Sequence, residues 1–148
     1  MLTNKRRVLI EWGDCDPAGI VFYPRYFQLF DTCTTALFWC AGLPKPEMLK
    51  RYNILGLALV DVQAKFIIPS RFGDEVLIET TIIEFRQSSF VISHKLFKAE
   101  QLAVECFETR AWIGIHPQDP MSIKAKPIPQ EVITLLSRPG RHEEIKLP

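Results

Sequence analysis

Four strand-like segments follow one another through residues 57–115, and the connections between them are too short to contain a helix. The segments span residues 57–68, 75–86, 89–99 and 102–115. Parallel neighbours in a sheet need a crossover of about a dozen residues or more, whereas antiparallel neighbours can be joined by a tight turn. The second half of the chain therefore predicts an antiparallel sheet rather than a fold that alternates strands with helices.

Alternation of apolar and polar residues identifies the face of this sheet that should be buried. The residues that share this face are Val76, Ile78, Thr80 and Ile82 in one segment, and Phe90, Ile92, His94 and Leu96 in the next. His94 is the one titratable side chain in this set. Its place among core positions favours a structural role over a place in a pocket.

One long apolar segment precedes these strands. Apolar side chains recur at helical spacing through residues 26–41, and Pro24 stands where it suits the first turn of a helix. Gly42 and Pro44 follow, as is typical of a helix end. Bulky residues on the other sides of the segment indicate that the helix is buried on more than one face. One such helix beside one sheet predicts that the sheet wraps around it.

Shorter elements complete the expected order. Residues 6–12 predict a strand, residues 46–52 a short helix and residues 128–136 a terminal helix. Residues 138–148 are polar and contain two prolines, so we expect a frayed tail there. The expected fold class is therefore α+β, with a curved antiparallel sheet of about five strands and a single domain over residues 1–137.

Composition argues against several classes of protein. Hydrophobic residues make up 47% of the chain and charged residues 24%, as in ordinary globular proteins. Lys and Arg number 18 against 17 Asp and Glu, so no basic surplus points to nucleic acid as a partner. No apolar run reaches the roughly 18 residues of a membrane span, and no signal peptide is recognisable. Because the four cysteines also lack C-x-x-C spacing, we expect a cytoplasmic protein with reduced thiols and no membrane partner.

The stretch G-D-C-D-P-A-G-I-V-F-Y-P, residues 13–24, places two aspartates in a tight turn just before the long helix. One interpretation is a plain connecting turn, in which the aspartates bond to backbone amides. A helix start, however, offers free N–H groups and a partial positive charge that can hold an oxyanion. A carboxylate beside such a site can attack an acyl carbon or activate a water, and Asp14 and Asp16 are the candidates.

Two other interpretations of the paired aspartates are disfavoured. Aspartyl-phosphate phosphatases also open with D-x-D after an apolar strand, but their fold alternates strands with helices. A calcium loop needs further oxygen ligands at alternate positions, which Pro17, Ala18 and Ile20 do not supply. The phosphate-loop, dinucleotide, zinc-protease and nucleophile-elbow motifs are absent as well, so the sequence predicts no metal site.

The same stretch, continued by R-Y-F and followed by Asp31, closely resembles the 4-hydroxybenzoyl-coenzyme A thioesterase family of hotdog-fold proteins. The resemblance covers most of residues 8–115 and includes A-G-L-P, F-I-I-P-S-R-F-G-D-E-V-L-I-E-T and E-F-R-Q-S-S-F. It implies a long central helix wrapped by a curved antiparallel sheet, in agreement with the order of elements above. It also implies homodimers, often paired into homotetramers, with active sites at the subunit interface.

The resemblance further implies hydrolysis of an acyl-CoA thioester. Asp16 then corresponds to the catalytic carboxylate, acting as nucleophile or as general base, and Asp14 becomes a supporting turn residue. The backbone N–H of Tyr23 corresponds to the group that holds the thioester oxygen. In the related Tol-Pal-associated branch a histidine stands at this position, so Tyr23 favours the branch that acts on aromatic acyl groups. No cofactor is implied, because coenzyme A is part of the substrate.

Substrate contacts are implied on the same basis. Gly19 is expected where the backbone needs conformational freedom or a close approach. Asp31 either contacts the acyl group or is an ordinary polar residue of the helix. Arg86, Ser88 and Ser89 fall where the family's hairpin approaches the phosphates of the coenzyme, or else they are plain surface residues.

The expected function is hydrolysis of an aromatic acyl-CoA, of the 4-hydroxybenzoyl or benzoyl type, to free acid and CoA, as in aromatic degradation. The aromatic residues early in the long helix favour an aryl pocket, although such rings are also common in cores. A thioesterase for short aliphatic acyl groups is the first alternative. A non-catalytic hotdog protein that binds acyl-CoA is the second.

Overall fold

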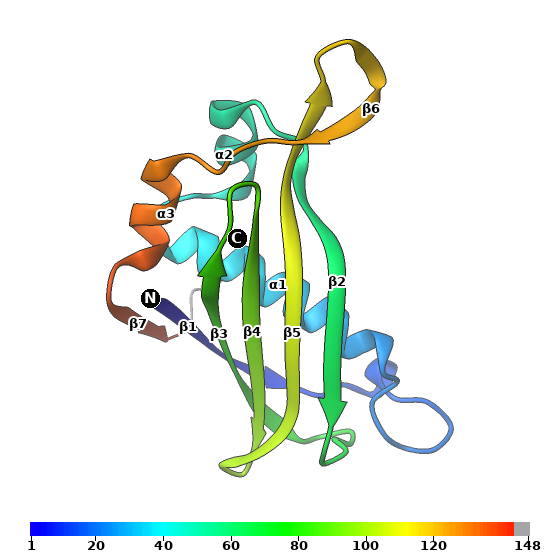
Figure 1. The fold of residues 1–148 in the computed structure, drawn as a ribbon. Helices are drawn as coiled ribbons and strands as arrows, with labels where there is room; N and C mark the ends of the chain where they lie inside the picture. The colour runs from blue at the N-terminus through cyan, green and yellow to red at the C-terminus, as the bar shows by residue number, and fades with distance from the viewer. Residues whose placement is uncertain (144–148) are drawn as a thin grey trace.

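One curved sheet wraps around helix α1 (Pro24–Cys40), which lies against the concave side of the sheet (Figure 1). The computed structural model describes residues 1–143 of the chain. The other elements in chain order are β1 Leu2–Leu9, the 3-10 turn Trp12–Asp14, α2 Lys45–Tyr52, β2 Gly56–Phe66, β3 Glu75–Phe85, β4 Ser89–Lys98, β5 Gln101–His116, β6 Asp119–Ala125, α3 Gln130–Ser137 and β7 Gly140–Glu143.

The strand order in the sheet is β2-β5-β4-β3-β1-β7, and β6 pairs with the C-terminal end of β5. Neighbouring strands are antiparallel, except that β1 and β7 run parallel. Tight hairpins join β3 to β4 and β4 to β5, as the short connections predicted (Figure 1). The α+β class and the antiparallel sheet around a long helix are therefore confirmed.

The first strand lies earlier than predicted. It was expected at residues 6–12, but β1 spans Leu2–Leu9, and Trp12–Asp14 is a 3-10 turn. The extent of β1 is set by its pairing with β3, which runs from Thr3 opposite Thr81 to Leu9 opposite Glu75. Local residue preferences do not encode such a long-range register, because strand propensity depends strongly on the neighbouring strand.

The two strands near the C-terminus were not predicted. β6 folds back on β5 as a hairpin, and β7 pairs in parallel with residues 2–5. The expected frayed tail at 138–148 is therefore wrong at residues 140–143, whereas residues 144–148 lie outside the described residues. The polar sequence of β7 carries little strand signal of its own, and its partner is the otherwise unpaired edge of β1. The predicted terminal helix is confirmed as α3.

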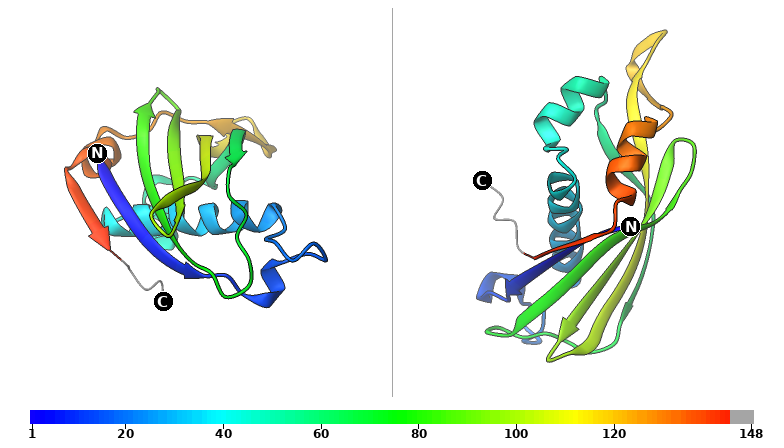
Figure 2. Two further views of the ribbon diagram at one scale, coloured as in Figure 1. Left: turned by 90° about the horizontal axis from the view of Figure 1, so that it is seen from below. Right: turned by 90° about the vertical axis from the view of Figure 1, so that its left-hand side faces the viewer.

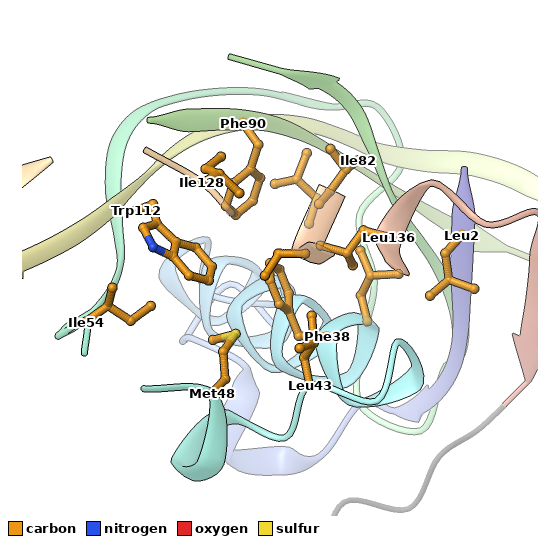
Figure 3. Close-up of a cluster of buried hydrophobic side chains, with 13 residues drawn as sticks. Leu2, Phe38, Leu43, Met48, Ile54, Ile82, Phe90, Trp112, Ile128 and Leu136 are labelled. Atoms are coloured by element: carbon orange, nitrogen blue, oxygen red, sulfur yellow. The ribbon is translucent and has the colours of Figure 1, made fainter. Parts of the chain in front are cut away.

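Two clusters of buried apolar side chains hold α1 against the sheet. One surrounds the C-terminal half of the helix and includes Phe38, Phe90 and Trp112 (Figure 3). The other surrounds the N-terminal half and includes Phe30 and Leu96. Burying a side chain of this size stabilises a fold by roughly 1.5–3 kcal/mol. The second cluster therefore fixes the start of α1, and with it the turn that precedes the helix.

The face of the sheet that packs on α1 is the one that alternation predicted. The expected inward residues of β3 and β4 are all buried, His94 included. The four cysteines are free thiols, as expected from their spacing. Within residues 1–143, no helix combines the length and the apolar character that crossing a membrane requires.

Candidate active site

Residues 14–22 form a tight turn that is closed by its own backbone. The Asp16 N–H donates to the Ile20 carbonyl at 3.0 Å, and the Gly19 N–H donates to the Asp16 carbonyl at 2.9 Å. The Phe22 N–H donates to the Asp14 carbonyl at 2.8 Å. The chain therefore folds back on itself and keeps Asp16 close to the start of α1.

The two aspartates of this turn make different hydrogen bonds. Oδ2 of Asp14 accepts one from the Glu11 N–H at 2.9 Å, as befits a residue that shapes the turn. Oδ1 of Asp16 accepts one from the Ala18 N–H at 2.9 Å. Within residues 1–140, no protein donor binds Oδ2 of Asp16, and the side chain is only half-buried. One carboxylate oxygen is thus available to a ligand.

Most backbone N–H groups at the start of α1 donate hydrogen bonds within the chain. The Arg25 N–H donates to the Phe22 carbonyl at 2.8 Å, and the Tyr26 N–H donates to the Tyr23 carbonyl at 3.1 Å. Pro24 has no N–H. The Tyr23 amide, immediately before the helix, has no acceptor in the described part of the chain. It is available to an outside oxygen at the positive end of the helix dipole.

The backbone angle at position 19 requires a glycine. Its φ of +76° lies in the left-handed region that side chains disfavour. A Cβ there would lie 3.6 Å from Nη1 of Arg71, which is an ordinary contact, so space is not the constraint. Arg71 donates to the Gly19 carbonyl at 3.4 Å, and the Val21 N–H donates to the Ser70 carbonyl at 2.9 Å. The loop between β2 and β3 therefore clamps the turn.

Asp31 belongs to an ion cluster that joins α1 to the sheet. Its Oδ1 accepts a hydrogen bond from Nη1 of Arg110, on β5, at 2.8 Å. Nε of Arg110 donates in turn to Oε2 of Glu108 at 2.8 Å. The Asp31 side chain is 55% exposed and that of Arg110 only 7%. Asp31 therefore lies at the surface and its partner lies inside the protein.

His94 lies behind Glu108, deeper in the core. Its Nε2 is 3.5 Å from Oε2 of Glu108, longer than an ordinary hydrogen bond, and its Nδ1 is 2.9 Å from Oγ1 of Thr80. The ring stacks on Phe30 with 4.8 Å between centroids. Burial lowers the pKa of His94, although Glu108 opposes the shift. The imidazole is therefore neutral at pH 7, and its Nδ1 shares a hydrogen bond with the Thr80 hydroxyl.

The cluster as a whole is anionic. Burial alone would raise the pKa of Glu108, but His94 and Arg110 lower it overall. With His94 neutral, the carboxylates of Asp31 and Glu108 face the single guanidinium of Arg110, which leaves one net negative charge. Among residues 1–140, whose side chains the structure describes, no group of three His, Cys, Asp or Glu side chains is placed to hold a metal ion.

An open groove of about 580 Å³ lies beside this cluster. Phe27 and Asp31 line it from α1, Leu57 and Leu59 from β2, and Arg110 from β5. Gln28, Thr32 and Glu108 line it as well, so the groove combines an apolar wall of Phe27, Leu57 and Leu59 with a polar side that includes the ion cluster. This is the usual composition of a small-molecule site, in which a few polar groups fix the orientation of an apolar ligand.

Arg86, Ser88 and Ser89 lie together at the hairpin between β3 and β4, but away from Asp16. This hairpin is at the end of the sheet beside the C-terminal half of α1, whereas the turn of residues 14–22 precedes the other end of the helix (Figures 1 and 2). Arg86 is exposed and pairs with Glu84 at 2.8 Å. A single chain therefore does not bring the expected coenzyme residues to the expected catalytic residues.

Comparison with known proteins identifies the family to which this chain belongs. A family model described as the thioesterase-like superfamily matches residues 10–136. The chain belongs to this superfamily. A relative of this chain is the 4-hydroxybenzoyl-CoA thioesterase of Pseudomonas sp. strain CBS-3. The two sequences are 33% identical over 135 residues, which cover 86% of this chain and 93% of the relative.

Solved structures of thioesterases share the fold. The X-ray structure of an aspartate-to-asparagine mutant of 4-hydroxybenzoyl-CoA thioesterase, complexed with 4-hydroxybenzoyl-CoA, matches with a TM-score of 0.84 and 31% identity over 91% of this chain and 99% of that chain. A gentisyl-coenzyme A thioesterase matches with a TM-score of 0.76 and 30% identity over 90% and 99% of the two chains. The hotdog fold is thereby confirmed, and this thioesterase-like protein is a thioester hydrolase.

The sequence analysis missed Glu108 and Arg110. Both lie on the buried face of β5, in alternation with Cys106 and Trp112. Two charged residues at inward positions of one strand break the usual burial pattern, and this was the signal that could have identified them. Their link to Asp31 could not be read, because 79 residues separate Asp31 from Arg110.

Proposed function

We propose that this thioesterase hydrolyses an aromatic acyl-CoA, of the 4-hydroxybenzoyl or benzoyl type, to the free acid and CoA. The observation that carries the proposal is the presence of one uncommitted oxygen on Asp16 and one uncommitted amide, that of Tyr23, around the start of α1. Thioester hydrolysis needs both a nucleophile or base for the carbonyl carbon and a donor for the carbonyl oxygen. Two similar enzymes are named for hydroxylated aromatic CoA thioesters, which supports the substrate class.

Asp16 acts in one of two ways. As nucleophile, its Oδ2 bonds to the thioester carbon, the carbon–sulfur bond breaks, and CoA leaves as a thiolate that takes up a proton. Water then hydrolyses the resulting anhydride to the free acid. As general base, Asp16 takes a proton from the water that attacks the carbon directly, the carbon–sulfur bond then breaks, and the departing CoA thiolate takes up that proton. In both cases the Tyr23 amide stabilises the oxyanion, a contribution typically worth about 10²–10³-fold in rate.

The groove beside Asp31 suits an aromatic acyl group. Helix α1 rises about 10 Å between Pro24 and Asp31, a length that an aromatic acyl group with polar contacts at both ends can span. Phe27 and Leu59 supply apolar wall in the same groove. We assign Asp31 to contact with the far end of the acyl group, where its carboxylate accepts a hydrogen bond from a ring hydroxyl.

A second copy of the chain would complete this site. Strand β2 is at the free edge of the sheet, and its Val60 and Phe66 side chains are exposed. An unpaired apolar edge is a natural surface for strand pairing. Because Arg86, Ser88 and Ser89 lie at the far end of their own chain, we assign them to the coenzyme of a partner's site. The proposed assembly is therefore a homodimer, with pairs of dimers forming a homotetramer.

The function is tested by a panel of purified CoA thioesters with detection of the released thiol. Benzoyl-CoA, 4-hydroxybenzoyl-CoA, phenylacetyl-CoA and butyryl-CoA are compared by kcat/KM, and one of the first two is expected to lead. A lead for butyryl-CoA would replace the proposal with the short aliphatic class. Saturable binding without thiol release from any member of the panel would replace it with an acyl-CoA-binding protein.

A further inference from the structure

Arg110 is buried between two carboxylates, and the reaction described above uses neither its charge nor its hydrogen bonds. The side chains of Arg110 and Glu108 are only 7% and 1% exposed. Removing charges from water is costly, and apolar residues of similar volume are often at least as stabilising as a buried ion pair. The stability of the fold therefore does not account for this cluster, and its geometry points to another task.

The cluster is a chain of contacts, in which Glu108 holds Arg110 and Arg110 holds Asp31 by hydrogen bonds. Thr80 bonds to Nδ1 of His94 at 2.9 Å, and Nε2 of His94 faces Glu108 at 3.5 Å. Glu108 binds Nε of Arg110, which leaves Nη1 pointing to Asp31. Because the guanidinium is planar, fixing Nε also fixes the direction of Nη1. The core of the sheet thus determines where Arg110 presents its last donor.

Asp31 is the one member of the chain that reaches the surface. Its side chain is 55% exposed on α1, so by itself it would sample several rotamers. The 2.8 Å bond from Arg110 selects one of them. Asp31 and Arg110 line the same groove, so the selected position is at the wall where an acyl group is proposed to lie.

We propose that Arg110 is a positioning residue that holds the Asp31 carboxylate at the groove wall, and that the enzyme thereby discriminates in favour of acyl groups carrying a hydrogen-bond donor. This inference rests on the proposed function, in which Asp31 contacts the acyl group. The donor class is a neutral ring hydroxyl or amine. A carboxylate on the acyl group is disfavoured, because the wall already carries one net negative charge.

The test compares two substrates that differ by one hydroxyl group, 4-hydroxybenzoyl-CoA and benzoyl-CoA. The ratio of their kcat/KM values is measured for the wild type, Asp31→Asn, Arg110→Gln, Arg110→Lys and the Asp31→Asn/Arg110→Gln double variant. The wild type is expected to prefer the hydroxylated substrate, and Arg110→Gln to reduce the ratio by roughly tenfold, the scale of one hydrogen bond to a charged group. Arg110→Lys keeps the charge without the planar fork, so its ratio is expected to lie between those of the wild type and Arg110→Gln.

The ratio separates positioning from a structural effect, because a general loss of active enzyme lowers both substrates equally. The double variant is expected to show the ratio of Asp31→Asn alone, since Arg110 acts through Asp31. If Arg110→Gln does not fold, Arg110→Lys is measured in its place. A substrate ratio in Arg110→Lys equal to that of the wild type then contradicts the inference. Arg51→Gln, which removes the exposed 2.7 Å pair with Glu131 on the surface, is the matched control and should keep the wild-type ratio.

Failure of the inference is distinguishable from failure of the proposed function. A wild-type enzyme that hydrolyses both substrates without preference, or a ratio unchanged in Arg110→Gln, overturns the role of Arg110 and leaves the thioesterase proposal intact. A ratio lost in Asp31→Asn but kept in Arg110→Gln overturns positioning alone. Absence of thiol release from both substrates overturns the proposed function, and the inference with it.

Discussion

The Ala18 amide donates a 2.9 Å hydrogen bond to Oδ1 of Asp16, so the turn itself orients the carboxylate on which the proposed reaction depends. An asparagine at this position keeps an oxygen acceptor for that bond. Its other terminal atom becomes an amide nitrogen, which is neither a nucleophile nor a base. The orientation and the chemistry of residue 16 can therefore be separated by one substitution.

Asp16→Asn is expected to keep the wild-type melting temperature and assembly but to lose about 10²–10⁴-fold in kcat, the range for a removed acid–base group. Steady-state kinetics with thiol detection and a thermal melt measure both quantities. Asp14→Asn is the matched control, because Asp14 binds the Glu11 amide, and it should affect stability more than kcat. Wild-type turnover in pure Asp16→Asn enzyme contradicts the proposed mechanism.

Two substitutions at Tyr23 test its amide separately from its phenol hydroxyl. Tyr23→Phe keeps the amide and is expected to leave kcat nearly unchanged. Tyr23→Pro removes the N–H at a residue whose φ of −51° is within the range of proline, so kcat should fall by about 10²–10³-fold with little loss of helix. Circular dichroism and kcat are the measurements. Equal losses in the two variants would assign the effect to the phenol instead.

Gly19→Ala tests whether the left-handed backbone angle holds the turn. We expect a loss of about 1–2 kcal/mol in the free energy of unfolding, together with reduced kcat, because alanine disfavours the angle of +76°. Gly13→Ala is the control in the same segment, since a Cβ at Gly13 meets nothing within 4 Å. Urea titration compares the two variants. Equal stability of Gly19→Ala and wild type would show that the turn does not depend on this angle.

Stability should fall as the pH drops through the ordinary pKa of histidine, about 6.5. The folded state lowers the pKa of His94, so below pH 6.5 the unfolded chain binds a proton that the folded chain does not. The stabilisation is therefore complete above pH 6.5, and His94 contributes a slope of at most about 1.4 kcal/mol per pH unit below it. The lowered pKa of Glu108 acts only at more acidic pH, nearer the ordinary range of a carboxyl group.

Urea unfolding between pH 7.5 and 5.5 measures this slope, and His94→Asn is the comparison. The asparagine amide can accept the Thr80 hydrogen bond but does not titrate, so the variant should be less stable overall yet show a shallower pH dependence. The charged groups near His94 are Glu108, Arg110 and Asp31. An identical slope in the variant would place the titration elsewhere.

The proposed dimer is tested at the free edge of the sheet. Val60 is 65% exposed on β2, and Val60→Lys is expected to shift the protein to a monomer and to remove activity with it. Met121→Lys, at a residue 94% exposed on β6, adds the same charge away from that edge and should change neither property. Light scattering and kcat are measured together. An active monomer of Val60→Lys would contradict the shared site.

The parts of the fold that follow from local periodicity were predictable. Pro24 and Gly42 bracketed α1 correctly, and alternation in β3 and β4 identified their buried face. The extent of β1 and the existence of β7 were not predictable, because both depend on backbone pairing between distant segments. Residues 140–143 in particular have no apolar alternation from which a strand could be inferred.

The candidate site also has a part that was predictable from the sequence and a part that was not. Asp16 and Gly19 lie in the turn of residues 14–22 and Tyr23 follows it directly, so a sequence motif places them together. The partnership of Asp31 with Arg110 arises only when α1 packs on β5, and no local pattern reveals it. The separation of the β3–β4 hairpin, which carries Arg86, from the turn that carries Asp16 likewise becomes visible only in three dimensions (Figure 1).

Strand β7 has a consequence for how many copies of the chain can join. It covers the outer side of β1 only at Leu2–Lys5, so the edge strand there is four residues long, whereas the edge strand β2 is eleven residues long. Two identical molecules that pair through their β2 strands use the long edge of each, so the assembly closes as a dimer. A molecule with a second long edge at β1 could instead recruit a further copy at every step and grow into a fibre, and the short β7 edge offers little backbone for such pairing.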